Sequence, residues 1–193
     1  MAGFIDEFMN SMGPEVSQQL ARNLGINKKA AMQIIPQVAP LILGGLQKQK
    51  INYGGEERVD HILNKYGSAS VLDNIGDLFS KKLQDSTADP RLGGLLGDSG
   101  VQASNALQNK FNLDAGTAMK IIPMLAPVIL GFLTKKRDAD GLGSNGIAAM
   151  LDRDGDGSIL DDIAGMFLQK TSGAGAKGNI LGGLLGGLLG KKR

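Results

Sequence analysis

The apolar residues of this chain follow the spacing of helices. No segment shows the sustained alternation of apolar and polar residues that a half-buried strand would have. The strongest apolar run, IIPMLAPVILGFL, covers residues 121–133. Its length of about thirteen residues is short of the roughly twenty that a membrane-spanning helix needs. We therefore interpret the run as the core helix of an all-α protein.

The same pattern of apolar and polar positions occurs twice. Two segments align without a gap at an offset of 87 residues. The first begins at Val16 and reads VSQQLARNLGINKKAAMQIIPQVAPLILGGLQKQK. The second begins at Ala103 and reads ASNALQNKFNLDAGTAMKIIPMLAPVILGFLTKKR. After a slip of one residue, the similarity continues with residues 61–79 over residues 149–167. Self-similarity of this length predicts two tandem copies of a small helical unit, related by pseudo-two-fold symmetry.

This repeat divides the chain into four expected parts. They are an N-terminal helix at 1–15, a first helical repeat at 16–97, a second repeat at 98–170 and a flexible, basic Gly/Leu-rich tail at 171–193. The stretch DSTADPRLGGLLGDSG, residues 85–100, is the expected junction between the two copies.

Helix ends are marked by residues with known end preferences. Pro14 lies near the predicted start of a helix and Gly25 at its end, and Asp114 occupies the N-cap position before AGTAMKIIP. Each long apolar helix contains two prolines, Pro36 and Pro40 in the first copy and Pro123 and Pro127 in the second. Because proline removes a backbone donor and clashes with the preceding turn, we expect these core helices to be kinked or interrupted.

Composition narrows the class of protein. The chain has no cysteine, which excludes disulfides, thiolate metal sites and a cysteine nucleophile. The net charge of +2 provides no overall attraction to nucleic acid, so no nucleic-acid partner is expected. The N-terminal sequence MAGFIDEFMN lacks the pattern of a signal peptide. We expect a cytoplasmic location, and export by a non-classical route stays open.

The second copy carries one segment with candidate chemistry, LDRDGDGSILDD at residues 151–162. Its spacing matches a helix–loop–helix calcium site, with Gly157 at the sharp turn. The candidate metal ligands are Asp152, Asp154, Asp156, Ser158 through its carbonyl, Asp161 and Asp162. Ile163 occupies the position that normally holds a bidentate Glu. The loss of that ligand predicts weak calcium binding, with a dissociation constant of about 10⁻⁴ to 10⁻³ M.

The first copy offers an alternative interpretation of this acidic loop. It has Asn64, Tyr66 and Ser68 at the positions of the three spaced aspartates, so the turn can form without a metal. Aspartates also favour turns and the N-termini of helices. Five aspartates within eleven residues nevertheless repel one another, and a bound cation is the simplest reason to collect them. Since Ile159 aligns with Val71 and both are β-branched, we also predict that the two loops pack side by side.

These segments carry a resemblance to a known family. The helical unit with IIPQVAPLILGGL, the acidic segment LDRDGDGSILDD and the Gly/Leu-rich end together resemble the YidB-like bacterial family, a domain of unknown function. The most specific element is the acidic segment. The resemblance implies a small helical bacterial protein with no established activity. In this chain the unit occurs twice, and only the second copy keeps the acidic signature.

The tail NILGGLLGGLLGKKR combines a helical leucine pattern with many glycines. The leucine face consists of Leu181, Leu184, Leu185, Leu188 and Leu189. Each intervening glycine costs a helix about 1 kcal/mol relative to alanine, so we expect the tail to order only when its leucine face is buried. Beyond Asp162 every charged residue is basic. The tail could therefore dock on its own domain, on a partner chain or on an anionic membrane surface.

No catalytic constellation emerges from the sequence. The only histidine, His61, is expected to face outward, because Val59, Ile62 and Leu63 mark the buried face of its helix. Our leading hypothesis is a non-enzymatic interaction or assembly protein with a weak calcium site, which binds a protein partner or itself. The alternative is a membrane-active or exported effector that acts through the Gly/Leu tail, and an uncharacterised hydrolase comes third.

Overall fold

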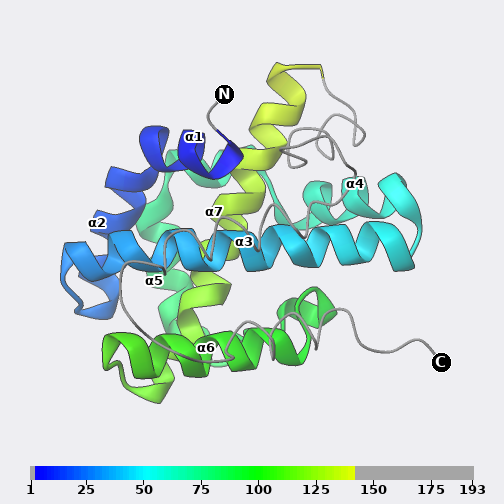
Figure 1. Cartoon of the computed structure of the whole chain (residues 1–193). Helices are drawn as coiled ribbons and strands as arrows, with labels where there is room; N and C mark the ends of the chain where they lie inside the picture. Colours follow the sequence, from blue (N-terminus) through cyan, green and yellow to red (C-terminus); the bar gives the residue numbers. More distant parts are fainter. Residues whose placement is uncertain (1–2, 142–193) are drawn as a thin grey trace.

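The computed structural model describes residues 3–141, and all regular structure in this part of the chain is helical, which confirms the all-α prediction (Figure 1). The elements are α1 (Phe4–Ser11), α2 (Gly13–Leu24), α3 (Lys28–Asn52), α4 (Gly55–Tyr66), the 3₁₀ helix η1 (Ala69–Asp73), α5 (Ile75–Gln84), the 3₁₀ helix η2 (Leu92–Gly94), α6 (Asp98–Phe111) and α7 (Ala115–Ala139). The predicted junction at 85–100 contains η2 and ends within the first turn of α6.

The predicted helix ends are those of the structure. Pro14 lies in the first turn of α2, and Gly25 caps its C-terminus in the left-handed conformation, with φ of 65°, which glycine adopts without a Cβ penalty. Asp114 caps α7 by accepting a hydrogen bond from the backbone N–H of Thr117 at 2.9 Å. The matched residue Asn27 caps α3 in the same way.

The two long helices α3 and α7 each have 25 residues, and neither is interrupted by its prolines. Pro36 and Pro40 lie inside α3, and Pro123 and Pro127 lie inside α7. Each proline removes one backbone donor, but the surrounding turns keep their hydrogen bonds and bury apolar residues, which outweighs the local loss. The expected interruption is therefore wrong, whereas a kink without a break stays a prediction.

The length of α7 also corrects the argument about membrane spanning. The helix extends beyond the apolar run at 121–133 into flanking polar residues, because the backbone hydrogen-bond ladder continues there. By length and composition alone, both α3 and α7 could cross a membrane. In the fold, however, 61% and 72% of their most apolar segments are buried, as in the core helices of globular proteins.

The shorter helices pack around this central pair. In Figure 1, α7 passes behind α3, and each long helix carries the helix that precedes it, α2 on α3 and α6 on α7. The helices α4 and α5 both pack on α7, and α5 also contacts α2. The elements α4, η1 and α5, which precede α6 in the chain, therefore lie against α7.

Helix α1 is held on α7 by three aromatic rings. The ring of Phe132 lies 5.5 Å from that of Phe4 and 5.3 Å from that of Phe8, measured between centroids. The Phe8–Phe132 pair is edge-to-face, a favoured aromatic geometry, and Phe8 is fully buried. The predicted N-terminal helix at 1–15 thus corresponds to α1, which ends at Ser11, while the next residues already belong to α2.

Candidate functional site

The candidate residues singled out by the sequence lie outside the described residues. This holds for the proposed metal ligands Asp152, Asp154, Asp156, Ser158, Asp161 and Asp162, and for the tail residues Leu181, Leu184, Leu185, Leu188 and Leu189. Between residues 3 and 141, no group of three or more His, Asp or Glu side chains is placed to hold a metal ion. The calcium hypothesis therefore stays a prediction.

The structure does describe the first-copy counterpart of the acidic loop. Helix α4 continues to Tyr66, so the positions that match the first two calcium ligands, Asn64 and Tyr66, are helical. The turn that follows contains η1, and the hydroxyl groups of Ser68 and Ser70 are hydrogen-bonded at 2.7 Å. At its end, Asn74 caps α5 by accepting from the backbone N–H of Asp77. This backbone is a helix–3₁₀–helix turn held together by its own hydrogen bonds.

This first-copy turn lies directly on α7. A Cβ on Gly67 would come within 2.9 Å of backbone atoms of Leu130, and a Cβ on Gly131 would come within 2.8 Å of the carbonyl oxygen of Ser68. Both glycines are therefore required by close backbone packing. The Val71 side chain also faces Gly131, at 2.9 Å from the same Cβ position. Because Ile159 lies beyond the described range, the predicted pairing of Val71 with Ile159 stays a prediction.

The last turn of α7 carries the main charged cluster that joins separate helices. Arg137 donates to Asp60 of α4 at 3.0 Å and to Asn64 of α4 at 3.1 Å. Its side chain is only 14% exposed, and its carboxylate neighbours, Asp138 first and then Asp60, raise the pKa of the guanidinium. Asn64, which aligns with the candidate metal ligand Asp152, thus has a structural role that sequence spacing alone does not indicate.

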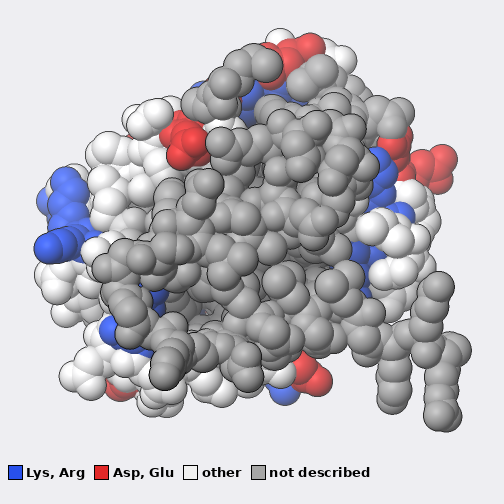
Figure 2. All heavy atoms as spheres, in the orientation of Figure 1, with Lys and Arg blue, Asp and Glu red and all other residues white. Residues whose placement is uncertain are grey.

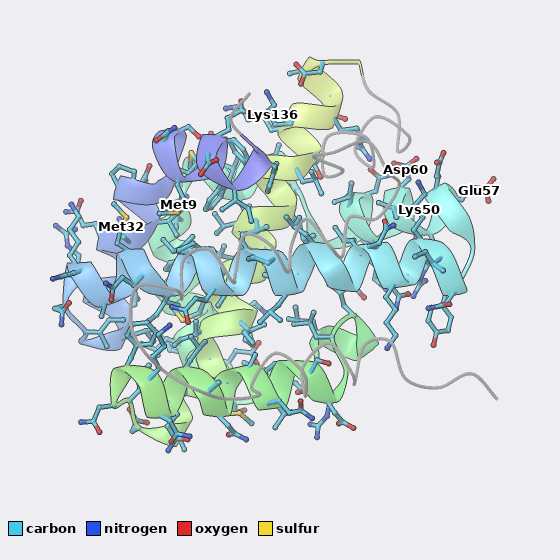
Figure 3. All side chains as sticks on the ribbon, viewed as in Figure 1. Met9, Met32, Lys50, Glu57, Asp60 and Lys136 are labelled. Atoms are coloured by element: carbon cyan, nitrogen blue, oxygen red, sulfur yellow. The ribbon has the colours of Figure 1, made fainter. Side chains whose placement is uncertain are left out.

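Lys136 makes the corresponding connection to α1. Its ammonium group lies 2.7 Å from a Glu7 carboxylate oxygen and 3.4 Å from Asp140, and the hydrogen bond to Glu7 is the main reason that the pKa of Lys136 is raised. Figure 3 shows Lys136 at the far end of α7, beside α1. These pairs fix helices in place, and they do not assemble the acid, base and nucleophile that a catalytic site needs.

The surface of the described residues has few remarkable features. His61 is exposed on α4 while Val59, Ile62 and Leu63 are buried, as predicted. Among large apolar residues, Ile51, Tyr53 and Tyr66 are the most exposed. On the part of the face that Figure 2 shows in colour, the basic and acidic side chains lie in small separate groups.

The described residues define a small all-helical protein built around two long buried helices. The model of a family described as a bacterial protein of unknown function (DUF937) matches residues 6–136 and 135–193, so the chain belongs to this family. No curated protein and no solved structure matches the chain. The resemblance to a bacterial domain of unknown function is thereby confirmed, whereas the YidB-like assignment and the tandem duplication stay predictions. The two matched segments meet near residue 135, away from the expected junction at 85–100.

Proposed function

We propose that this protein is a non-enzymatic helical interaction or assembly protein whose segment 151–162 binds calcium weakly. The observation that carries the proposal is the spacing of the carboxylates, with Asp152, Asp154 and Asp156 followed by Gly157 at the sharp turn. The charged side chains at the end of α7 support the non-enzymatic part, because they connect helices to one another.

The test of the calcium site is a thermal melt with and without the ion. A ligand that binds only the native state stabilises it by mass action. With a dissociation constant near 10⁻⁴ M, about 1 mM calcium stabilises by about 1.4 kcal/mol, which raises Tm by about 3–6 °C for a chain of this size. The double variant Asp154→Asn with Asp156→Asn should lose this calcium-dependent rise.

The matched control is Asp73→Asn in the first copy. Asp73 is exposed and aligns with Asp161, but its segment lacks the spaced aspartates. The Asp73→Asn variant should keep the full calcium-dependent rise in Tm. Magnesium should raise the Tm of the natural sequence less than calcium does, because magnesium tolerates flexible oxygen ligands poorly. An unchanged Tm for the natural sequence at millimolar calcium would exclude the site.

A membrane-active role is the second candidate. The Gly/Leu tail supports it, because the leucines share one helical face and the charged residues after Asp162 are all basic. Vesicles of anionic and of neutral lipid separate the two proposals. Sedimentation of the full chain with anionic vesicles, lost when Leu184 and Leu188 are changed to Ser, would favour the membrane role. No sedimentation with either lipid would favour docking on protein.

A further inference from the structure

Within the described part of the chain, the two long helices contact different sets of elements. On α7, the turn of Leu130 and Gly131 carries Gly67, Ser68 and Val71 of the first copy in close contact. The matched turn of α3 consists of Leu43 and Gly44, at the offset of 87 residues.

Within residues 3–141, η1 packs extensively on α7, and neither 3₁₀ helix makes a comparably extensive contact with α3, although Leu95 and Leu96 closely approach the neighbouring Gly45. Gly44 has the same small size as Gly131, and both Leu43 and Gly44 are buried, so this turn of α3 is a packing surface. Since Gly131 is needed for the close approach of a loop, the same requirement explains a glycine at 44. The turn of α3 therefore matches, in sequence and in burial, the turn of α7 on which the loop at 67–71 packs.

The second copy contains a segment that fits this surface. Gly155 aligns with Gly67, and Ile159 aligns with Val71. Three further residues of the first-copy segment that are buried in the fold recur unchanged, namely Leu72 as Leu160, Ile75 as Ile163 and Phe79 as Phe167. The residues of the segment at 67–79 that are buried in the fold are thus residues whose type is kept at the aligned positions in 155–167.

The end of α7 also resembles the end of α3, after which α4 and the loop at 67–71 follow. Its last described residue, Gly141, follows α7 as Gly54 follows α3, and both glycines have positive φ. In the first copy the next element is α4, which leads into the turn that packs on α7. The remaining chain is long enough for the same succession, because residues 149–167 align with residues 61–79.

We propose that the Leu43–Gly44 turn of α3 is the docking surface for residues 149–167 of the same chain. Each copy then places its loop on the long helix of the other copy. Charge complementarity supports the pairing, because Lys50 of α3 matches Arg137 of α7, and Asp152 matches the Asn64 that Arg137 binds. At the position that matches the Arg137–Asn64 hydrogen bond, this arrangement predicts a Lys50–Asp152 ion pair in the calcium-free chain.

Paired cysteines test this arrangement directly, because the natural chain has no cysteine. The full-length double variant with Lys50→Cys and Asp152→Cys is treated with a short bismaleimide crosslinker. A chelator is present to remove calcium. Arg137→Cys with Asn64→Cys reports the known contact. Both pairs should crosslink within one chain at similar rates, as measured by intact mass and peptide mapping. The control double variant, Lys28→Cys with Asp152→Cys, has one thiol at the opposite end of α3. It should crosslink at least tenfold more slowly than the pair at positions 50 and 152.

Three results would overturn the proposal, two of them within one chain. One is crosslinking of the Arg137 and Asn64 positions without crosslinking of the Lys50 and Asp152 positions. The other is equal crosslinking of Asp152 to Lys50 and to Lys28, which would mean that the segment has no fixed site on α3. A product of twice the chain mass would also contradict docking within one chain.

A charge exchange provides a second measurement that does not depend on reagent access. Lys50→Asp and Asp152→Lys should each lower Tm, and the combined variant should recover most of the loss, because the ion pair is restored with reversed polarity. Losses that simply add would show that the two positions do not interact. Lys50 also pairs with Glu56 at 3.1 Å, and that contact is lost in Lys50→Asp and in the combined variant but kept in Asp152→Lys. Because its loss is the same in the two variants that lack Lys50, it cannot produce the recovery.

Discussion

The helices α3 and α7 have the same length, the same type of N-cap and prolines at matched positions, yet they have different neighbours. At one matched position, α7 has Phe132 and α3 has Gly45. Phe132 fills the space between α7 and α1, whereas Gly45 lets the chain after η2 approach so closely that a Cβ would lie 2.8 Å from the Leu95 carbonyl oxygen. Similar sequences thus form similar helices in α3 and α7. A single different residue on the helix surface, such as Gly45 or Phe132, decides which neighbour packs at that position.

The C-terminal turns of the two helices differ in the same way. In α3, Gln49 accepts a hydrogen bond from Arg58, and Lys50 pairs with Glu56, so both contacts join the helix to the start of α4, directly after it. In α7, Lys136 and Arg137 reach α1 and α4, which lie far earlier in the chain. Figure 3 shows Lys50 beside the α3–α4 connection, with Asp60 further along α4. The end of α7 therefore makes long-range contacts, whereas the end of α3 makes contacts with the helix directly after it.

The largest expected effect comes from Phe132. Phe132→Ala removes the ring that holds α1 and leaves a cavity, which should lower the free energy of unfolding by about 3–5 kcal/mol. Urea denaturation measures the loss. The control Tyr66→Ala removes an aromatic ring that is 54% exposed, and it should change stability by less than about 0.5 kcal/mol. A loss below about 1 kcal/mol for Phe132→Ala would mean that α1 is not held by this cluster.

The matched position in α3 should respond to added volume. Gly45→Ala improves helix propensity by about 1 kcal/mol, but its Cβ would meet the Leu95 backbone, and overpacking of this kind costs about 1–3 kcal/mol. We expect a net loss of stability in thermal or urea denaturation. In the control Gly76→Ala, the nearest atoms belong to the movable Gln19 side chain, so the variant should be neutral or stabilised. Equal responses of the two variants would contradict the close approach at Gly45.

A smaller effect is expected at the end of α7. Arg137→Gln removes the hydrogen bonds to Asp60 and Asn64 and should cost about 1 kcal/mol, because the side chain is largely buried. Arg137→Lys should recover only part of this loss, since an ammonium group cannot reproduce the guanidinium fork. Lys82→Gln, which breaks a local pair with Asp85, should cost less than about 0.5 kcal/mol and is the control. Double-mutant cycles with Asp60→Asn would assign the difference to the long-range pair.

The smallest effect distinguishes the two N-caps by pH. The hydroxyl and backbone N–H of Thr117 hold the pKa of Asp114 below its usual range, whereas Asn27 does not ionise. Because the folded pKa is lower than the unfolded one, the stability that Asp114 contributes is complete above the unfolded pKa of about 3.9. It is lost as the pH falls through the folded pKa.

Urea midpoints measured between about pH 6 and pH 3 test this difference. Asp114→Asn should make stability less dependent on pH in that range, and Asn27→Asp should make it more dependent. The same slope in all three proteins would mean that neither cap is coupled to protonation.

The sequence alone determined the helical class and the helix ends at Pro14, Gly25 and Asp114. Pro14, Gly25 and Asp114 act within one or two turns of their own helix, so their effect can be predicted without knowledge of the fold. The outward direction of His61 follows from the same short-range periodicity. For the candidate calcium site, ligand spacing predicts which residues could bind, because a loop of this type draws its ligands from one short segment.

Tertiary packing decided the rest. The continuity of α3 and α7 across their prolines depends on apolar residues that neighbouring helices bury, and the positions of α1 and η1 on α7 depend on residues separated by more than fifty positions in the chain. Local periodicity contains no information about such pairs, since it reports only which face of a helix is apolar. Shape complementarity at positions such as Phe132, Gly131 and Gly45 selects the partner of each face, because close packing tolerates neither a void nor an extra methyl group.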